Sequence, residues 1–519
     1  MKKAIYLIIA LIGLSAPSCS DSMLDFSPTD SGSGKELLKS ASTAITSVNG
    51  VYRSMWTAGW STTANTHQCF GIAAYNLALD CMADDLIMQS QGNGWFWGDH
   101  CYNVKSNYTS SAFRSYDVWY ANYKWIANVN YIIDAEPEMA GTEADVAYVA
   151  GQAYAIRALC YLTLAAWFAR APYNPLTGAS RWNEPCVPVY TTGTSIDTGG
   201  QPRESLRTVY GRIDQDIDRA IELLEKARET TLAENNKSHI NLYVALGIKS
   251  RACLAEGDWD GAFKAAKRVI DEGGYAVGTK SDLTGGMNSL DKQNVMWGAG
   301  IQVADQAGGY AGFFTHMDNK EGAYAKSAPK LISKQLYNRI SATDIRRDWW
   351  DPSDKESPYV SKKFSFANVA SFLGDYIYMR VEEMYFTAAE AALRLDDLKS
   401  ARELMNTVMA ERDPGYSANN RSGTLLGATT TTWTGSFLEN ILTHRRIELW
   451  GEYGRLFDVR RLGQGIDRRT DDGFSEECIS MMNRRNVNIT KADTYDWVLT
   501  IPKAELDANP NINEEDQNP

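Results

Sequence analysis

One short segment carries the sharpest chemical signal in the chain. Three aromatic residues stand there between two glycines, in the order Asn93, Gly94, Trp95, Phe96, Trp97, Gly98, Asp99 and His100. Exposed rings suit sugars because the apolar C–H face of a sugar stacks on them, while a side chain such as Asn93 or His100 hydrogen-bonds the hydroxyl rim. The segment has no helical period, and we predict that it binds a glycan. The alternative is that one or more of the three rings packs into the folded body.

Two further sets of residues extend this candidate site. Asp84 and Asp85 precede the aromatic segment and could reach ligand hydroxyls, or equally cap a turn. A second loop that combines glycine with aromatic residues runs over residues 308–314, where Tyr310 and Phe313 would complete a binding platform.

Clusters of charged residues raise the question of catalysis. They comprise Arg380, Glu382, Glu383, Glu390, Arg445, Arg446, Glu448, Arg455 and Asp458. Glycoside hydrolysis needs two carboxylates about 5–10 Å apart across a sugar cleft, and sequence alone does not establish such a pair. Their spacing on amphipathic helices favours ion pairs that fix helix packing or a partner interface. We therefore expect no catalytic residues.

Motifs for metals, cofactors and nucleophiles are missing from the sequence. It has no HExxH, no GxSxG, no P-loop and no GxGxxG after a strand. No cysteines form CxxC, although a bridge among Cys69, Cys81 and Cys101 stays open. The acidic stretch 467–472 has calcium-type ligands but lacks EF-hand spacing. We expect no cofactor, and bound calcium has no motif to support it.

Composition excludes several classes of protein. The 519 residues carry a net charge of −12, with 44% apolar and 22% charged residues. A chain of this length is no disulfide-stapled miniprotein, and its acidic balance argues against nucleic acid as a partner. It could hold two or more domains or one large domain built from repeats.

Helical periodicity dominates the segments that must position these residues. The pattern predicts helices over residues 35–55, 112–133, 144–168 and 205–228, the last with Ser205 as its N-cap. Two pairs of helices with short turns follow, at 241–256 with 261–272 and at 379–395 with 398–411. Their small residues and a period near 34 residues are typical of tetratricopeptide-like pairs. Residues 275–375 are instead rich in Gly, Ser, Thr, Asp and aromatics, with a short buried strand at 295–297.

The first residues read as a secretion signal. Lys2 and Lys3 precede an apolar run, Ala4 to Leu14, that is too short to span a bilayer. Small residues then lead directly into Cys19, which predicts cleavage after residue 18 and lipidation of Cys19. Residues 19–34 would form the lipidated tether. No later segment of about 18 apolar residues appears, so we expect the lipid to be the only contact with the membrane.

Four segments together resemble the SusD/RagB family. They are Ala155 to Tyr161 with Ala171 to Tyr173, Tyr243 to Trp259, Met379 to Ala391, and Arg445 to Trp450 continuing through Gly454 to Arg461. The lipoprotein start and Leu24-Asp25-Phe26 fit the same family, and the last two segments are its most specific marks.

The resemblance implies a fold and a role. Family members are all-α, with tetratricopeptide-like helix pairs and a loop-rich variable part that holds ligand. Here that implies one domain over residues 35–519, with the repeat helices within 112–272 and 379–450 and the variable part at 275–378. Glycan-binding relatives build an aromatic arc partly from a Trp-x-Trp loop, a spacing that Trp95 and Trp97 match.

The resulting hypothesis is a nutrient-binding lipoprotein on the outer surface of the outer membrane. By resemblance, it captures glycan and delivers it to a SusC-like TonB-dependent transporter, without catalysis. One alternative is the same scaffold binding peptides, and another is a surface glycoside hydrolase.

Overall fold

The computed structural model describes residues 34–57, 66–102, 113–195, 197–233, 237–302, 311–492 and 494–519. The expected signal peptide, Cys19 and Tyr310 lie outside the described residues. Within them the chain is mainly helical, which confirms the fold class predicted from the periodicity.

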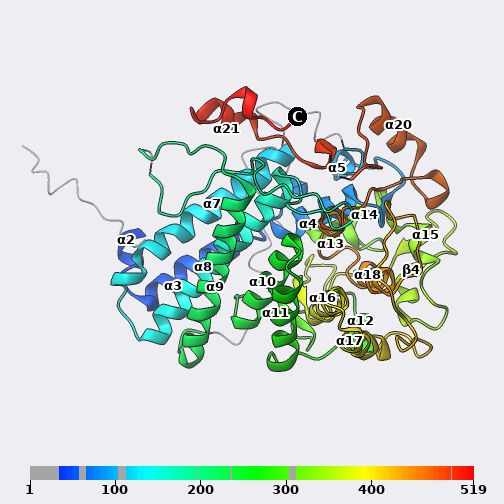
Figure 1. The fold of residues 1–519 in the computed structure, drawn as a ribbon, viewed down its shortest axis with the longest axis horizontal. Coiled ribbons are helices and arrows are strands. Elements are labelled where there is room, and N and C mark those ends of the chain that lie inside the picture. The colour runs from blue at the N-terminus through cyan, green and yellow to red at the C-terminus, as the bar shows by residue number, and fades with distance from the viewer. Residues whose placement is uncertain are drawn as a thin grey trace, which may run out of the picture.

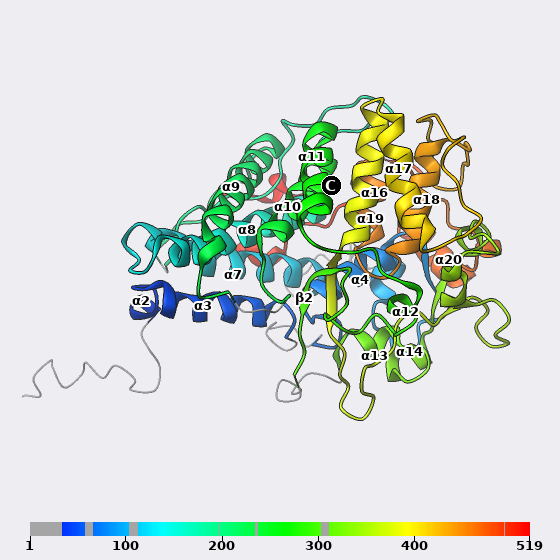
Figure 2. The same ribbon diagram turned by 90° about the horizontal axis from the view of Figure 1, so that it is seen from below.

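Long helices pack side by side and form the body of the molecule (Figures 1 and 2). They are α3 (Ala41–Ser54), α7 (Phe113–Ala135), α8 (Glu143–Phe168), α9 (Leu206–Lys226), α10 (Leu242–Glu256), α11 (Trp259–Glu272), α16 (Val381–Arg394), α17 (Leu398–Ala410) and α18 (Phe437–Glu448). Helix α11 packs against α16, so the two predicted helix pairs adjoin although 100 residues or so separate them in sequence. The arrangement is tetratricopeptide-like, as predicted.

Side-chain caps explain where several of these helices begin. Ser205 accepts a hydrogen bond from the backbone N–H of Thr208 at 3.2 Å, which confirms its predicted role as N-cap of α9. Asn241 caps α10 in the same way through Val244 N–H at 3.0 Å. Gly257 ends α10 with a φ of 80°, a conformation that glycine adopts without strain, and so permits the short turn into α11.

Two predicted helix boundaries were wrong. The helix expected over 35–55 is broken into α2 (Gly34–Leu37) and α3, because Ala140 exchanges backbone hydrogen bonds with Lys39 and Ala41 at 2.8 Å each. Residue 379 was expected to begin a helix, but it lies in a strand paired with Trp297. Pairing with the neighbouring strand satisfies the backbone hydrogen bonds of this residue, and α16 begins two residues later.

Short elements make up the described part of residues 275–378, as predicted. A two-stranded antiparallel sheet joins β2 (Val295–Ala299) to β6 (Tyr376–Arg380), and a four-stranded sheet has the order β1-β3-β5-β4. The latter consists of β1 (Leu86–Met88), β3 (Lys330–Ile332), β4 (Trp350–Asp351) and β5 (Val360–Ser361).

Short α-helices connect these elements along the whole chain. They are α4 (Ile72–Met82), α5 (Trp97–His100), α12 (Lys280–Leu283), α13 (Phe313–Met317), α14 (Ala323–Ser327), α15 (Lys334–Tyr337), α19 (Arg455–Arg461), α20 (Glu476–Arg484) and α21 (Lys503–Ala508).

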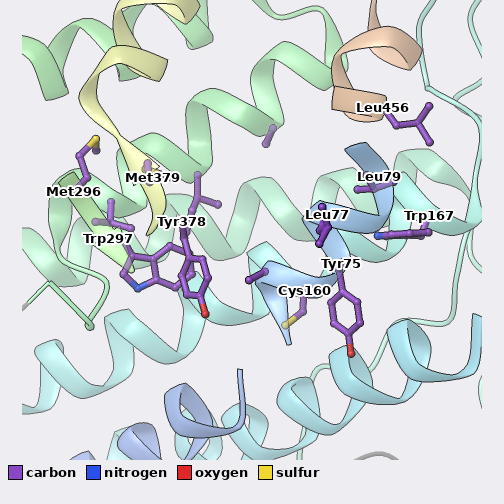
Figure 3. Close-up of a cluster of buried hydrophobic side chains, with 14 of the residues drawn as sticks. Tyr75, Leu77, Leu79, Cys160, Trp167, Met296, Trp297, Tyr378, Met379 and Leu456 are labelled. Carbon is purple, nitrogen blue, oxygen red and sulfur yellow. The ribbon is translucent and has the colours of Figure 1, made fainter. Parts of the chain in front are cut away.

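Buried apolar side chains from distant parts of the chain meet at the centre of the molecule (Figure 3). Tyr75 and Leu79 of α4 lie there with Trp167 of α8 and the β2–β6 sheet. Trp297 of β2 packs against Tyr378 of β6, with ring centroids 5.0 Å apart. This core couples the small sheet to the helical body.

Helix α8 is the one helix among the described residues that is long and apolar enough to cross a membrane. This corrects the expectation that no later segment would reach that length. However, 78% of its apolar window is buried against the rest of the protein, as in a core helix. All seven described cysteines are buried and none of them is disulfide-bonded to another.

Candidate functional site

The acidic pair Asp84–Asp85 lies in the interior and does not face a ligand. Both side chains are buried, and Arg446 contacts Asp84 at 2.9 Å and Asp85 at 2.6 Å. Arg455 contacts Asp84 at 3.1 Å from the next helix, α19. Burial acts to raise the pKa of Asp84, but the two guanidinium groups outweigh it and hold that pKa at about 2. The prediction that these carboxylates reach ligand hydroxyls is therefore wrong for this structure.

The other charged residues of the sequence pattern also pair with one another. Arg380 binds Glu448 at 3.0 Å and Glu452 at 2.7 Å, and Arg412 binds Glu448 from a second side at 3.0 Å. A separate group joins α16, α18 and α19 through Arg461–Glu390, Arg461–Asp458, Arg445–Asp458 and Arg445–Glu383. These pairs confirm the interpretation that the charges fix helix packing, since each carboxylate named here meets a guanidinium group.

Most of the candidate ligand residues in the aromatic segment are also buried. Phe96, Trp97 and His100 have exposed fractions of 0%, 4% and 0%. The buried pair of Arg114 with Asp99, at 2.7 Å, draws helix α5 inward and carries these side chains with it. Phe96 adopts a φ of 60°, and its N–H donates to Gln68 at 2.8 Å. The expected exposed arc over all three rings is therefore corrected: Phe96 and Trp97 pack into the body.

Phe313 of the second loop is buried as well. Its ring packs edge-on against Phe364 at 5.2 Å, and its backbone N–H donates to the Tyr376 hydroxyl at 3.1 Å. This packing corrects the prediction that Phe313 completes an exposed platform. Tyr310, its predicted companion, lies outside the described residues.

Trp95 and Asn93 remain at the surface. Asn93 is exposed and Trp95 is half-buried. The indole of Trp95 stacks on the His67 ring, with centroids 4.8 Å apart and planes inclined by 19°. Tyr324 of α14 meets Trp95 edge-on at 6.1 Å. The structure thus places one tryptophan of this loop at the surface, where the sequence predicted two.

Hydrogen bonds hold the support of Trp95 in place. The Tyr324 hydroxyl is bonded to Nδ1 of His67 at 2.6 Å, and Nε2 of His316 donates to the His67 carbonyl at 2.7 Å. Burial lowers the pKa of His316, so its ring is neutral at pH 7 and carries its proton on Nε2. The His316 ring in turn packs edge-on against the buried Phe96 ring, with ring centroids 4.9 Å apart. An aromatic stack therefore runs from the core to Trp95.

Sequence reasoning missed the two residues that support Trp95. His67 precedes it by 28 positions and Tyr324 follows it by 229, in segments without helical period. Nothing in the local pattern around either residue marks it as a partner of the aromatic loop. Only the fold brings the three together.

A wide polar groove of about 880 Å³ lies elsewhere, beside α3 and the residues on either side of β2. Its residues include Trp56, Arg53, Lys237, Asp291, Gln302 and Asp375. Several of its polar groups already serve the fold: Asp375 accepts the N–H groups of Leu290 and Ile301 at 3.0 Å each. Arg53 lies over the Trp56 ring at 5.9 Å. Trp95 is therefore the stronger candidate for stacking.

The described residues form a tetratricopeptide-like helical body with an aromatic cluster at its surface. Two family models match the chain, one described as the SusD family over residues 326–519 and one as "starch-binding associating with outer membrane" over residues 43–254. Together the two matches confirm the resemblance to the SusD/RagB family that the sequence predicted.

Solved structures agree with this assignment. A SusD-like carbohydrate-binding protein from Bacteroides vulgatus is similar over 92% of this chain and 98% of its own, with 25% identity and a TM-score of 0.72. A SusD superfamily protein from Bacteroides thetaiotaomicron has 21% identity and a TM-score of 0.73, over 92% and 100%. Surface glycan-binding protein A from the same species, in complex with laminarihexaose, shares the fold at 16% identity and a TM-score of 0.62, over 92% and 99%. No curated protein matches this chain.

Proposed function

We propose that this protein captures a glycan at the cell surface, with Trp95 as its stacking residue and Asn93 beside it as a hydrogen-bonding group. The observation that carries the proposal is the fixed geometry of the half-buried Trp95 ring against His67 and Tyr324. A ring already held in place loses little conformational freedom when a sugar stacks on it. Its apolar face suits the C–H face of a sugar better than a charged ligand.

The relatives support glycan as the class of ligand. One similar solved structure is a carbohydrate-binding protein, and another is a glycan-binding protein that holds laminarihexaose, a short oligosaccharide. Binding without conversion fits the charged residues, because the carboxylates of the helical pattern are engaged by arginines. Such carboxylates are poorly placed to act as the acid and base of a glycosidase.

The proposal extends to location and delivery. Lipidation at Cys19 would anchor the protein to the outer membrane, facing the exterior, and the captured glycan would pass to a SusC-like TonB-dependent transporter. The family description that mentions association with the outer membrane supports this location. The transporter as partner follows from the family resemblance of the sequence.

One observation favours a second candidate ligand, a peptide. With Phe96 and Trp97 buried, the loop offers one tryptophan instead of an arc, and a peptide depends less on stacking rings. The two ligand classes are separated by direct binding.

The experiment is titration calorimetry of residues 20–519 with a panel of oligosaccharides and of peptides, repeated with Trp95→Ala. Trp259→Ala is the matched control, because Trp259 is a half-buried tryptophan at the start of α11. We expect an oligosaccharide to bind and Trp95→Ala to weaken it at least about tenfold, or about 1.4 kcal/mol. Peptide binding without any oligosaccharide response would overturn the glycan proposal in favour of the second candidate.

A further inference from the structure

We propose that a groove beside helix α7 is a second binding site, for a neutral oligosaccharide. The groove has a volume of about 460 Å³, within the usual range of about 300–1,000 Å³ for ligand pockets. Helix α7 forms one wall, residues 190–195 with Thr198 form the opposite wall, and α21 closes one end. This site shares no residue with the Trp95 surface, and its ligand class rests on the proposed function.

Aromatic rings line the groove. Tyr120 and Tyr123 are half-buried and lie three positions apart on α7, which places them on the same face of the helix. Tyr190 meets Tyr123 edge-on from the opposite wall, with centroids 5.9 Å apart. Tyr116 stacks on Tyr120 at 5.5 Å with planes inclined by 10° and so fixes the orientation of that ring. Because Tyr123 and Tyr190 contact each other, these rings form one fixed aromatic surface, which suits the apolar face of a sugar.

The opposite wall is tied to the helical body along its length. The Tyr123 hydroxyl donates to the Pro188 carbonyl at 2.7 Å, and Asn130 donates to the Thr192 carbonyl at 2.9 Å. The Gly193 N–H donates to Asp134 at 2.7 Å. Three bonds from one helix to one extended segment mean that the groove exists before ligand arrives, which lowers the entropic cost of binding.

The polar groups at the rim favour a neutral, hydroxyl-rich ligand. Glu505 of α21 accepts from the Trp119 indole at 3.2 Å and from Asn509 at 2.8 Å, which positions its carboxylate at the groove. An ionised carboxylate has about four acceptor positions, so acceptor capacity remains for sugar hydroxyls. Lys124, exposed and 5.8 Å from the centre of the Tyr120 ring, supplies donors. One negative and one positive group give no net attraction for a charged ligand.

Hydroxyl groups complete the rim on the opposite wall. Ser195 and Thr198 line the groove, and both are exposed. The Tyr190 hydroxyl accepts from the Gln201 N–H at 3.0 Å, which leaves its own hydrogen to donate to a ligand. The rim thus offers both donors and acceptors, as recognition of a polyol requires.

The test is calorimetric stoichiometry with maltohexaose, cellohexaose, xylohexaose and laminarihexaose as separate probes. We expect the wild-type chain to bind its preferred probe at about two sites, and both Trp95→Ala and Tyr120→Ala to bind at about one. Tyr120→Phe retains the ring and is expected to bind like the wild type. Lys124→Ala, at an exposed position, should weaken the groove site about threefold with no change in Tm.

The outcomes separate the two proposals. If Trp95→Ala abolishes all binding, or if Tyr120→Ala and Lys124→Ala both bind like the wild type, the groove proposal is overturned and the proposed function stands. If no probe binds the wild-type chain, both are overturned. Lys124 is exposed, so Lys124→Ala should fold normally. That variant therefore tests the groove proposal even if Tyr120→Ala fails to fold.

Discussion

The Trp95 indole lies on the His67 ring at a centroid distance of 4.8 Å, although the two residues come from segments separated by a helix and a strand. His67 is itself held by Tyr324 and His316. The orientation of the one surface tryptophan in this loop is thus set by residues that would not touch ligand. Removing the support should change binding without removing the stacking ring.

His67→Ala should therefore weaken glycan binding about three- to tenfold, because Trp95 would have to be ordered on binding. His67→Phe retains a flat ring and is expected to keep most of the affinity. Calorimetry with the preferred oligosaccharide measures both. Equal affinities for wild type and His67→Ala would show that the stack does not position Trp95 for ligand.

Arg446→Met should destabilise the fold by about 3–5 kcal/mol, because it leaves the buried carboxylates of Asp84 and Asp85 short of a partner. Denaturant unfolding gives the free energy. Lys264→Met is the control, since its pair with Asp260 is solvent-exposed and worth about 0–1 kcal/mol. A loss for Arg446→Met no larger than for the control would contradict a structural role for the pair.

Stability should fall with rising pH because of Asp80. Burial raises its pKa to about 8, whereas the unfolded chain titrates near 3.9. Between these values the folded state retains a proton that the unfolded state has released, so folding is progressively disfavoured as pH rises from about 4 to about 8. Asp80→Asn keeps the carbonyl that accepts the Arg455 N–H.

The variant should therefore lose less stability than wild type between pH 5 and pH 8.5, by more than about 1.4 kcal/mol, the value of one pKa unit. Unfolding by denaturant at the two pH values measures this difference. Asp260→Asn, at an exposed position, serves as the control. Parallel pH dependence in wild type and Asp80→Asn would rule out a raised pKa for Asp80.

Close packing of the helix pair α8–α9 depends on Gly151. A Cβ there would lie 2.9 Å from Leu224 Cγ and 3.2 Å from Leu223 Cβ. Gly151→Ala should destabilise by about 1–3 kcal/mol through overpacking. Gly211→Ala in α9 meets no atom within 4 Å and should stabilise by about 0.5–1 kcal/mol. The two Tm shifts should have opposite signs, and shifts of the same sign would contradict the packing described.

Cys19→Ser should release the protein from membranes. The signal peptide would still direct secretion, but no lipid would be attached to the mature chain. Membrane and soluble fractions of cells that produce the wild type and the variant provide the measurement. Retention of Cys19→Ser in the membrane fraction would contradict a lipid anchor at this position.

The fold was predictable to the extent that local patterns decide it. The capping residue Ser205 and the helical spacing of apolar residues after it predicted α9. The break between α2 and α3, in contrast, depends on backbone hydrogen bonds to Ala140, about 100 positions away. At the aromatic loop the sequence has no period, so it could not show which rings turn inward. That choice is made by the Asp99–Arg114 pair and by the left-handed backbone of Phe96.

The partners of Asp84 and Asp85 were also beyond local inference. Arg446 is more than 360 residues away, and a pair of neighbouring aspartates reads equally well as a turn cap or a ligand contact. The helical spacing of the charged residues did predict that the arginines of α18 and α19 would form ion pairs that fix helix packing. It did not identify which carboxylates they would bind.

Stacking of a sugar on Trp95 is the contact on which the proposed function depends. Its most direct test is the dissociation constant of the preferred oligosaccharide for wild type, Trp95→Phe, Trp95→Ala and Trp259→Ala, measured by calorimetry at one temperature. If a sugar stacks on Trp95, affinity should fall modestly in Trp95→Phe, fall at least about tenfold in Trp95→Ala, and stay unchanged in Trp259→Ala. Unchanged affinity in Trp95→Ala would contradict it.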